Sequence, residues 1–144
     1  MEPPGANPGP APGTRPANLR GAHVLLVEDN IVNQTVARAM LLEAGCRVAS
    51  VESGRQAVEA WGSTRFDLVL MDWQMADMDG CEATRRIRAM PSVHRVPIIA
   101  LTASAMEGDR ERCLAAGMDD YLAKPYTHAD LCAVLQRWLA STAG

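Results

Sequence analysis

Five polar side chains each stand directly after a short apolar run of the sequence. They are Glu28, Asp29, Asp72, Thr102 and Lys124. Any single acid in such a place is usually a solvated loop residue or a helix cap. If the runs are parallel strands of one sheet, however, their carboxyl ends meet at one edge and the five side chains converge. Crowded carboxylates repel one another unless a cation or a proton intervenes, so the set predicts a cation site.

Magnesium is the cation that this set favours. A hard divalent ion prefers carboxylate oxygens, and no His or Cys belongs to the set. A carboxylate can also attack phosphorus while a metal and an ammonium neutralise the moving charge. Lys124 is the single lysine among 14 basic residues, which indicates a need for a compact ammonium rather than a guanidinium, although chance is the alternative. The sequence does not determine whether the bond from Lys124 to Pro125 is cis, since most such bonds are trans.

The runs that carry these residues alternate with segments of helical periodicity. This alternation is typical of parallel strands joined by crossover helices, and several runs are apolar on both faces, as covered strands must be. The predicted strands are residues 23–28, 47–51, 67–71, 96–101 and 119–123. The predicted helices are residues 32–44, 54–61, 81–90, 107–116 and 129–140. The fold class is therefore α/β.

Several residues mark the ends and faces of these helices. Gly45 and Gly117 directly follow predicted helices, at the position where helices commonly end with a residue in the left-handed backbone conformation. Ser53 can cap the second helix, and Thr127 with Asp130 predicts a capping box for the last. In that last helix the apolar spacing predicts a core face, formed by Leu131, Val134, Leu135 and Trp138.

Composition indicates one domain that binds neither nucleic acid nor membrane. The chain has 144 residues, 48% of them hydrophobic, and a net charge of −3. That charge gives no whole-chain attraction to DNA or anionic lipid, and no apolar run approaches the roughly 20 residues of a spanning helix. The absence of a secretory start favours the cytoplasm. Free thiols are expected in a reducing compartment, because no CxxC pair occurs among Cys46, Cys81, Cys113 and Cys132.

The domain is expected to span residues 21–144. Residues 1–20 are dominated by Pro, Gly and Ala, which predicts a disordered linker or tail. Because the sequence ends just after the last predicted helix, no output domain is expected to follow it. Any output is therefore expected to act through contact with a partner.

Four segments resemble response-regulator receiver domains, the family that includes the chemotaxis regulator CheY. They are VLLVEDN, DLVLMDWQM followed by MDG, IIALTA and AAGMDDYLAKP. The resemblance covers nearly everything but the tail. It implies a doubly wound, flavodoxin-like sheet of five parallel strands in the order 2-1-3-4-5 with helices on both faces, the order for which CheY is itself a standard example.

By this resemblance Asp72 is the phosphoacceptor, and Glu28 and Asp29 are the acidic pair that supports Mg²⁺. Lys124 contacts the phosphoryl group, and Thr102 supplies the switch hydroxyl. The phosphoryl donor is the phosphohistidine of a histidine kinase or a histidine phosphotransfer protein. Such a domain catalyses its own phosphorylation and dephosphorylation, and turnover of a separate substrate is not expected.

Further positions take roles from the same resemblance. Gln74 supplies a metal-binding backbone carbonyl, and the small Ala103 leaves access to the phosphoryl group. Tyr121 is the aromatic residue that couples to the switch threonine, or else a half-buried tyrosine at the sheet edge. Ala76 departs from the family, since many members have proline there, and the change loosens the loop. Trp73 is expected to pack rather than to be exposed.

The VEDNIVNQ segment, with Asn30 and Asn33, resembles receivers fused to hybrid sensor kinases. A free-standing single-domain regulator is the alternative, and a monomer is favoured in either case. Phosphorylation adds about −1.5 to −2 charges and is expected to act on the face formed by the fourth helix and the fifth strand.

Three other classes of protein fit the sequence less well. A flavodoxin-like cofactor binder needs a phosphate-cradling loop, and no GxGxxG segment follows the first strand. A phosphatase with an aspartyl nucleophile usually has a second acid two residues after the first, where this chain has Gln74. A module that keeps only the fold would be expected to lose the acids and the lysine, which are all present.

Overall fold

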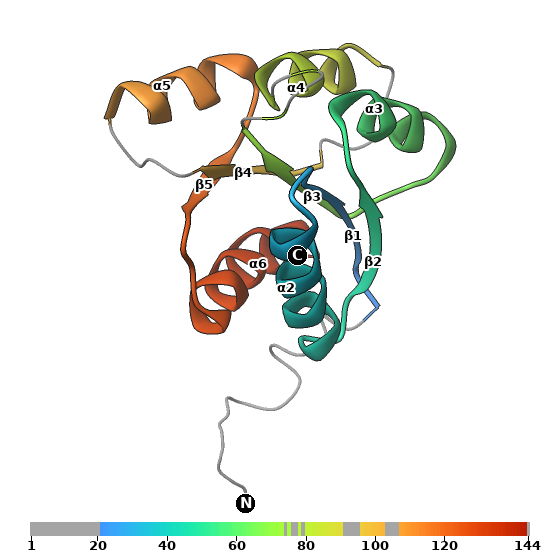
Figure 1. The fold of residues 1–144 in the computed structure, drawn as a ribbon, viewed down its shortest axis with the longest axis vertical. Coiled ribbons are helices and arrows are strands. Elements are labelled where there is room, and N and C mark those ends of the chain that lie inside the picture. Colours follow the sequence, from blue (N-terminus) through green and yellow to red (C-terminus); the bar gives the residue numbers. More distant parts are fainter. Residues whose placement is uncertain are drawn as a thin grey trace, which may run out of the picture.

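The computed structural model contains one sheet of five parallel strands (Figure 1). It describes residues 21–73, 75, 78, 80–90, 96–102 and 107–143. The strand order is β2-β1-β3-β4-β5, which confirms the expected doubly wound fold. The tail of residues 1–20 lies outside the described residues. The strands are β1 (His23–Val27), β2 (Arg47–Val51), β3 (Leu68–Asp72), β4 (Ile98–Thr102) and β5 (Asp120–Ala123).

Helices cover both faces of the sheet. Figure 1 shows two of them, α2 and α6, on one face and the other three on the opposite face. This arrangement follows from right-handed crossovers between parallel strands. The helices are α2 (Ile31–Glu43), α3 (Gly54–Ser63), α4 (Gly80–Ala89), α5 (Glu107–Ala116) and α6 (His128–Ala143).

Each face of the sheet has its own apolar core. Val24 and Leu26 belong to the core that includes residues of α2 and α6, whereas Leu25 and Val27 belong to the core that includes residues of α3, α4 and α5. Successive strand residues point to opposite faces, so a strand covered on both sides must be apolar throughout. The predicted core face of the last helix is confirmed, since Leu131, Val134 and Leu135 are buried and Trp138 packs against them.

The predicted helix ends are confirmed by their capping bonds. The Ser53 side chain accepts a hydrogen bond from Gln56 N at 3.1 Å. Thr127 and Asp130 exchange side-chain-to-backbone bonds of 3.0 Å in both directions, which is the expected capping box. Gly45 and Gly117 have φ of 98° and 107°, values that favour glycine.

Some element boundaries differ from the predicted ones. The fourth strand begins at Ile98 rather than at residue 96, because Pro97 has no N–H to donate to a neighbouring strand. The third strand extends to Asp72, which stays in register with Leu101 of β4. Asp72 is therefore held by the sheet itself and not by a loop.

The helices and the four cysteines show two further properties of the chain. Among the described residues, none of the helices combines the length and the apolar character needed to cross a membrane. All four cysteines are free thiols, as predicted.

Alkaline pH is expected to destabilise the fold partly through Cys46. Burial, followed by the nearby Cys132 and Asp67, raises the pKa of Cys46 from 9.0 to about 11. The folded state therefore keeps this proton where the unfolded chain loses it, so the contribution is complete below about pH 9 and is lost as the pH rises toward 11. Between pH 8 and pH 10, Cys46→Ala is expected to lose about 1 kcal/mol less unfolding free energy than the parent. Urea denaturation at the two pH values measures this, and equal losses in both proteins would contradict it.

Candidate functional site

A cavity of about 190 Å³ opens at the carboxyl edge of the sheet. The register aligns the strand ends that surround it, since Val27 of β1 is opposite Met71 of β3. The cavity lining includes all five polar residues that the sequence places at strand ends: Glu28, Asp29, Asp72, Thr102 and Lys124. The structure therefore brings together side chains that are up to 96 positions apart in the chain.

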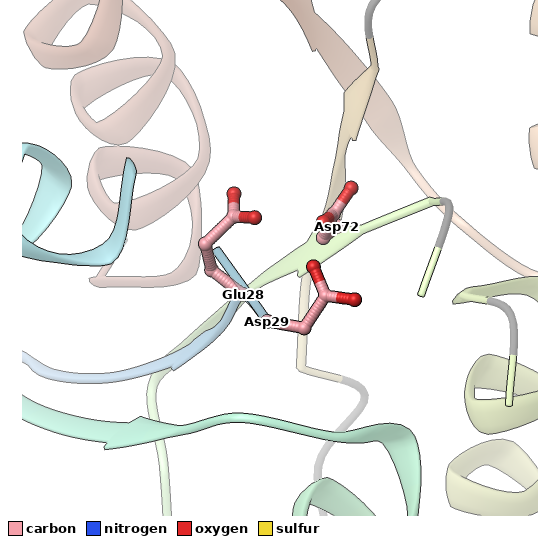
Figure 2. A group of neighbouring side chains, drawn as sticks. All are labelled: Glu28, Asp29 and Asp72. Carbon is pink, nitrogen blue, oxygen red and sulfur yellow. The ribbon is translucent and has the colours of Figure 1, made fainter. Parts of the chain in front are cut away.

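Three carboxylates lie close together in this cavity (Figure 2). Glu28, Asp29 and Asp72 each offer one oxygen, and these oxygens are within 4.8 Å of one another. Glu28 and Asp72 are only 2% and 5% exposed, whereas Asp29 is exposed. Burial strengthens the repulsion between like charges, because less water screens them. The donor set is made of hard oxygen ligands, which fits Mg²⁺.

Lys124 is the ammonium beside these carboxylates. Its Nζ donates to Glu28 Oε1 at 2.9 Å and lies 3.6 Å from Asp72 Oδ1. Its backbone N donates to Thr102 O at 2.7 Å, which ties the residue to the end of β4. The following bond to Pro125 is cis, so the structure settles the choice that the sequence left open. Three carboxylates and one ammonium leave a formal charge of −2, which a divalent cation would balance.

Thr102 lines the cavity, whereas Tyr121 does not. Thr102 ends β4, is 5% exposed and lines the cavity. Tyr121 is half-buried, packs against the core on the side of α3, α4 and α5, and is absent from the cavity lining. It pairs in register with Ala100, two residues before the threonine. The structure therefore places Tyr121 in the strand that pairs with that of Thr102, opposite the middle of β4 and outside the cavity lining.

Trp73 packs, as predicted, and also lines the cavity. It is 7% exposed, and its indole N–H donates to Cys81 Sγ at 2.9 Å. The guanidinium carbon of Arg112 in α5 lies 5.2 Å from the centre of a ring of the indole. A cation over an aromatic face is attracted to it, so this contact joins α5 to the residue that follows Asp72.

The first turn of α2 supplies two cavity residues that were noted in the sequence only as part of a family signature. Asn30 caps the helix by accepting from Asn33 N at 3.0 Å, and both residues line the cavity. The sequence feature that could have predicted them is the spacing: Asn33 comes four residues after Asp29, in the first turn of the helix that follows the first strand. Tyr126 is another residue near the acids, since burial and the charges of Glu28 and Asp72 raise its pKa to about 12.

Gly80 is a further residue that the site requires. A Cβ at this position would lie 2.6 Å from Asp72 O and 2.9 Å from Trp73 Cα. Gly80 N also donates to Trp73 O at 2.8 Å, so α4 begins directly against the end of β3. The MDG segment was the signal for this close approach. The expectations for Gln74, Ala76 and Ala103 lie outside the described residues.

Comparisons with known proteins agree on one family. Residues 24–136 match the model of the response regulator receiver domain. The chain is 43% identical over 126 residues to the sensor protein GacS of Pseudomonas syringae pv. syringae, and 44% identical over 115 residues to the signal transduction histidine-protein kinase BarA of Escherichia coli K12. These matches cover 85% and 80% of this chain but only 14% and 12% of the relatives, so the chain spans a small part of their length.

Two solved structures are similar over most of the chain. One is the receiver domain of the sensor histidine kinase PA1611 from Pseudomonas aeruginosa PAO1, which has a magnesium ion in its active site cleft. It shares 56% identity and a TM-score of 0.78, with 83% of this chain and 98% of that chain covered. The other is the receiver domain of Ssk1 from Saccharomyces cerevisiae, in a complex with the histidine phosphotransfer protein Ypd1. It shares 30% identity and a TM-score of 0.80, with 87% and 93% of the two chains covered.

Proposed function

The chain belongs to the response regulator receiver family, and from this we propose that it accepts a phosphoryl group on Asp72 from a phosphohistidine in a Mg²⁺-dependent reaction. One observation carries the proposal: a single cavity at the carboxyl edge of the sheet is lined by Glu28, Asp29, Asp72, Thr102 and Lys124. Membership of the family places the chain in two-component signalling. The acceptor, the metal ligands and the switch residues are the parts that we propose.

Magnesium fits the acidic side of the cavity. The three carboxylates offer oxygens within 4.8 Å of one another, and the related PA1611 receiver binds magnesium in its active site cleft. We assign Asp29, Asp72 and the backbone carbonyl of Gln74 as ligands, with Glu28 as the supporting acid. When bound, Mg²⁺ would neutralise charge on the transferred phosphoryl oxygens.

Three side chains of the cavity have separate roles in the proposed phosphoryl transfer. A carboxylate oxygen of Asp72 attacks phosphorus as the bond from phosphorus to the donor imidazole breaks. The bonding electron pair stays on the imidazole nitrogen, which takes up a proton, and Asp72 becomes an acyl phosphate. The Lys124 ammonium, 3.6 Å from Asp72 Oδ1, neutralises a phosphoryl oxygen. The Thr102 hydroxyl, at the end of the neighbouring strand, donates to another oxygen once the group is in place.

The donor is a histidine kinase or a histidine phosphotransfer protein. The related Ssk1 receiver binds such a protein, Ypd1, and GacS and BarA are sensor kinases. We favour a receiver that belongs to a hybrid sensor kinase, with a free-standing monomeric regulator as the alternative. Phosphorylation would bias the face formed by α5 and β5, where a partner reads the change.

The cluster of acids is expected to reduce stability while it serves function. Without Mg²⁺, Asp29→Asn is expected to raise the unfolding free energy on the order of 1 kcal/mol, because it removes one of three crowded negative charges. With Mg²⁺ at about 100 times its dissociation constant, the parent should gain about 2.7 kcal/mol and the variant much less. Urea denaturation with and without Mg²⁺ measures both effects. Glu59→Gln, at an exposed position of α3 outside the cavity lining, is the matched control and should behave as the parent.

Transfer from a phosphohistidine tests the proposed function directly. A radiolabelled phosphohistidine protein of the phosphotransfer class is mixed with the chain and Mg²⁺, and the label is followed on both proteins. We expect the label to leave the histidine protein and to appear on this chain as an acid-stable, base-labile acyl phosphate. Label that stays on histidine with several such donors, while the chain is folded and Mg²⁺ is bound, would contradict the proposal.

A further inference from the structure

Gln34, the last residue of the VEDNIVNQ segment, lies in the first turn of α2, and its side chain reaches back to the sheet. Its side-chain nitrogen donates to Glu28 O at 3.0 Å and to Val51 O at 3.2 Å. A primary amide has two N–H groups, so both bonds can form at once. Its backbone N donates to Asn30 O at 2.9 Å, which holds the residue in the helix. Gln34 therefore joins the start of α2 to the ends of β1 and β2.

The two acceptors lie where the acidic pair leaves the sheet. Glu28 O is the carbonyl of the peptide that links Glu28 to Asp29, and a peptide group is planar, so a bond to this oxygen fixes the orientation of the whole group. Val51 O also accepts from Glu28 N at 3.1 Å. Val51 O of β2 thus accepts hydrogen bonds both from the side-chain amide of Gln34 and from the backbone N–H of Glu28.

The orientation of this peptide decides where the two carboxylates point. Glu28 must face Lys124, to which it is bonded at 2.9 Å, while Asp29 must bring an oxygen within 4.8 Å of Asp72. Rotation of the linking peptide would turn at least one side chain away. Gln34 itself is not part of the cavity lining, so it can act on bound ions only through the backbone that it holds.

We infer that Gln34 is a positioning residue for the metal site, holding the peptide between Glu28 and Asp29 so that both carboxylates serve the same ion. This inference rests on the proposed function, because it concerns the same site. Residues that orient metal ligands from outside the coordination shell commonly change metal affinity by about 10–100-fold. Gln34 is an unusual member of that class, since it acts through a peptide carbonyl rather than through a ligand side chain.

The test compares two glutamines that both bond to backbone from the first turn of a helix. Gln34→Met removes the two donors and keeps an unbranched side chain. Gln56→Met is the matched control, because Gln56 accepts from Glu52 N at 2.8 Å in α3 and does not line the cavity. Isothermal titration with MgCl₂ alone, without a phosphodonor, should show a dissociation constant raised about tenfold or more in Gln34→Met. The control should match the parent.

A second measurement is independent of the metal. Amide hydrogen exchange of the segment from Glu28 to Asn30 in metal-free protein should be faster in Gln34→Met than in Gln56→Met. If Gln34→Met does not fold, Gln34→Glu takes its place, because it keeps the shape and sets an acceptor against two carbonyl oxygens. Mg²⁺ affinity and exchange equal to those of the parent would overturn the inference and leave the proposed function intact. Failure of the parent to bind Mg²⁺ would overturn both.

Discussion

Arg88→Met is expected to lower the free energy of unfolding by about 3–5 kcal/mol. Arg88 of α4 donates to Asp119 Oδ2 at 2.6 Å, to Val96 O at 2.7 Å and to Gly117 O at 3.0 Å. The side chains of Arg88 and Asp119 are only 18% and 11% exposed. Removing the guanidinium takes the cation away from a nearly buried carboxylate, to which Ile98 N also donates at 2.8 Å. The loss of one partner from such a pair is much more destabilising than the loss of an exposed pair.

Arg85→Met on the same helix is the matched control for this prediction. Arg85 bonds to Glu82 at 3.2 Å, but the two side chains are 59% and 43% exposed. An exposed pair contributes about 0–1 kcal/mol, so this variant should stay close to the parent. Urea denaturation of both variants gives the comparison. Equal effects at Arg88 and Arg85 would show that the part-buried network of Arg88 adds no more stability than an exposed ion pair.

Lys124→Met is expected to slow phosphorylation of the chain by about 100-fold or more, even at saturating Mg²⁺. In the part of the chain that the structure describes, Lys124 supplies the ammonium that contacts the acids of the cavity. Its Nζ lies 2.9 Å from Glu28 Oε1 and 3.6 Å from Asp72 Oδ1. Its loss removes a positive charge from beside Asp72, where we propose that the phosphoryl group is bound. The initial rate with acetyl phosphate, followed by intact mass, measures the effect.

Lys124→Arg separates charge from geometry in the same experiment. A guanidinium keeps the positive charge but is larger and planar, so it should restore only part of the rate. Full activity of Lys124→Arg would mean that any cation suffices at this position. A normal rate in Lys124→Met would remove the lysine from the mechanism.

The sequence was sufficient to predict that five polar side chains share one cavity, because the carboxyl ends of parallel strands meet at one edge of an α/β sheet. Once five apolar runs are assigned to parallel strands, the residues that follow them must meet at one edge. Glu28, Asp72 and Lys124 are therefore brought together by topology alone. The resemblance to receiver domains then supplied the strand order, which the structure confirms, and the role that we propose for each residue.

The bonds that hold the site in place could not be predicted in the same way. In the sequence Arg88 is indistinguishable from the surface arginines of the same helix. Its partner Asp119 is 31 positions away, so no local pattern predicts the pair. Gln34 bonds to backbone carbonyls, which every residue possesses, so no pairing of side-chain types marks it. Tyr121 was assigned to a switch by resemblance alone, and the structure places it outside the cavity lining.

The central claim is that Asp72 carries the phosphoryl group. Intact mass spectrometry after incubation with acetyl phosphate and Mg²⁺ tests it on the parent, on Asp72→Asn and on the control Asp130→Asn. We predict a mass gain of one phosphoryl group on the parent and the control, no gain on Asp72→Asn, and no gain on the parent when Mg²⁺ is chelated. Equal labelling of Asp72→Asn and the parent would place the acceptor elsewhere and contradict the account.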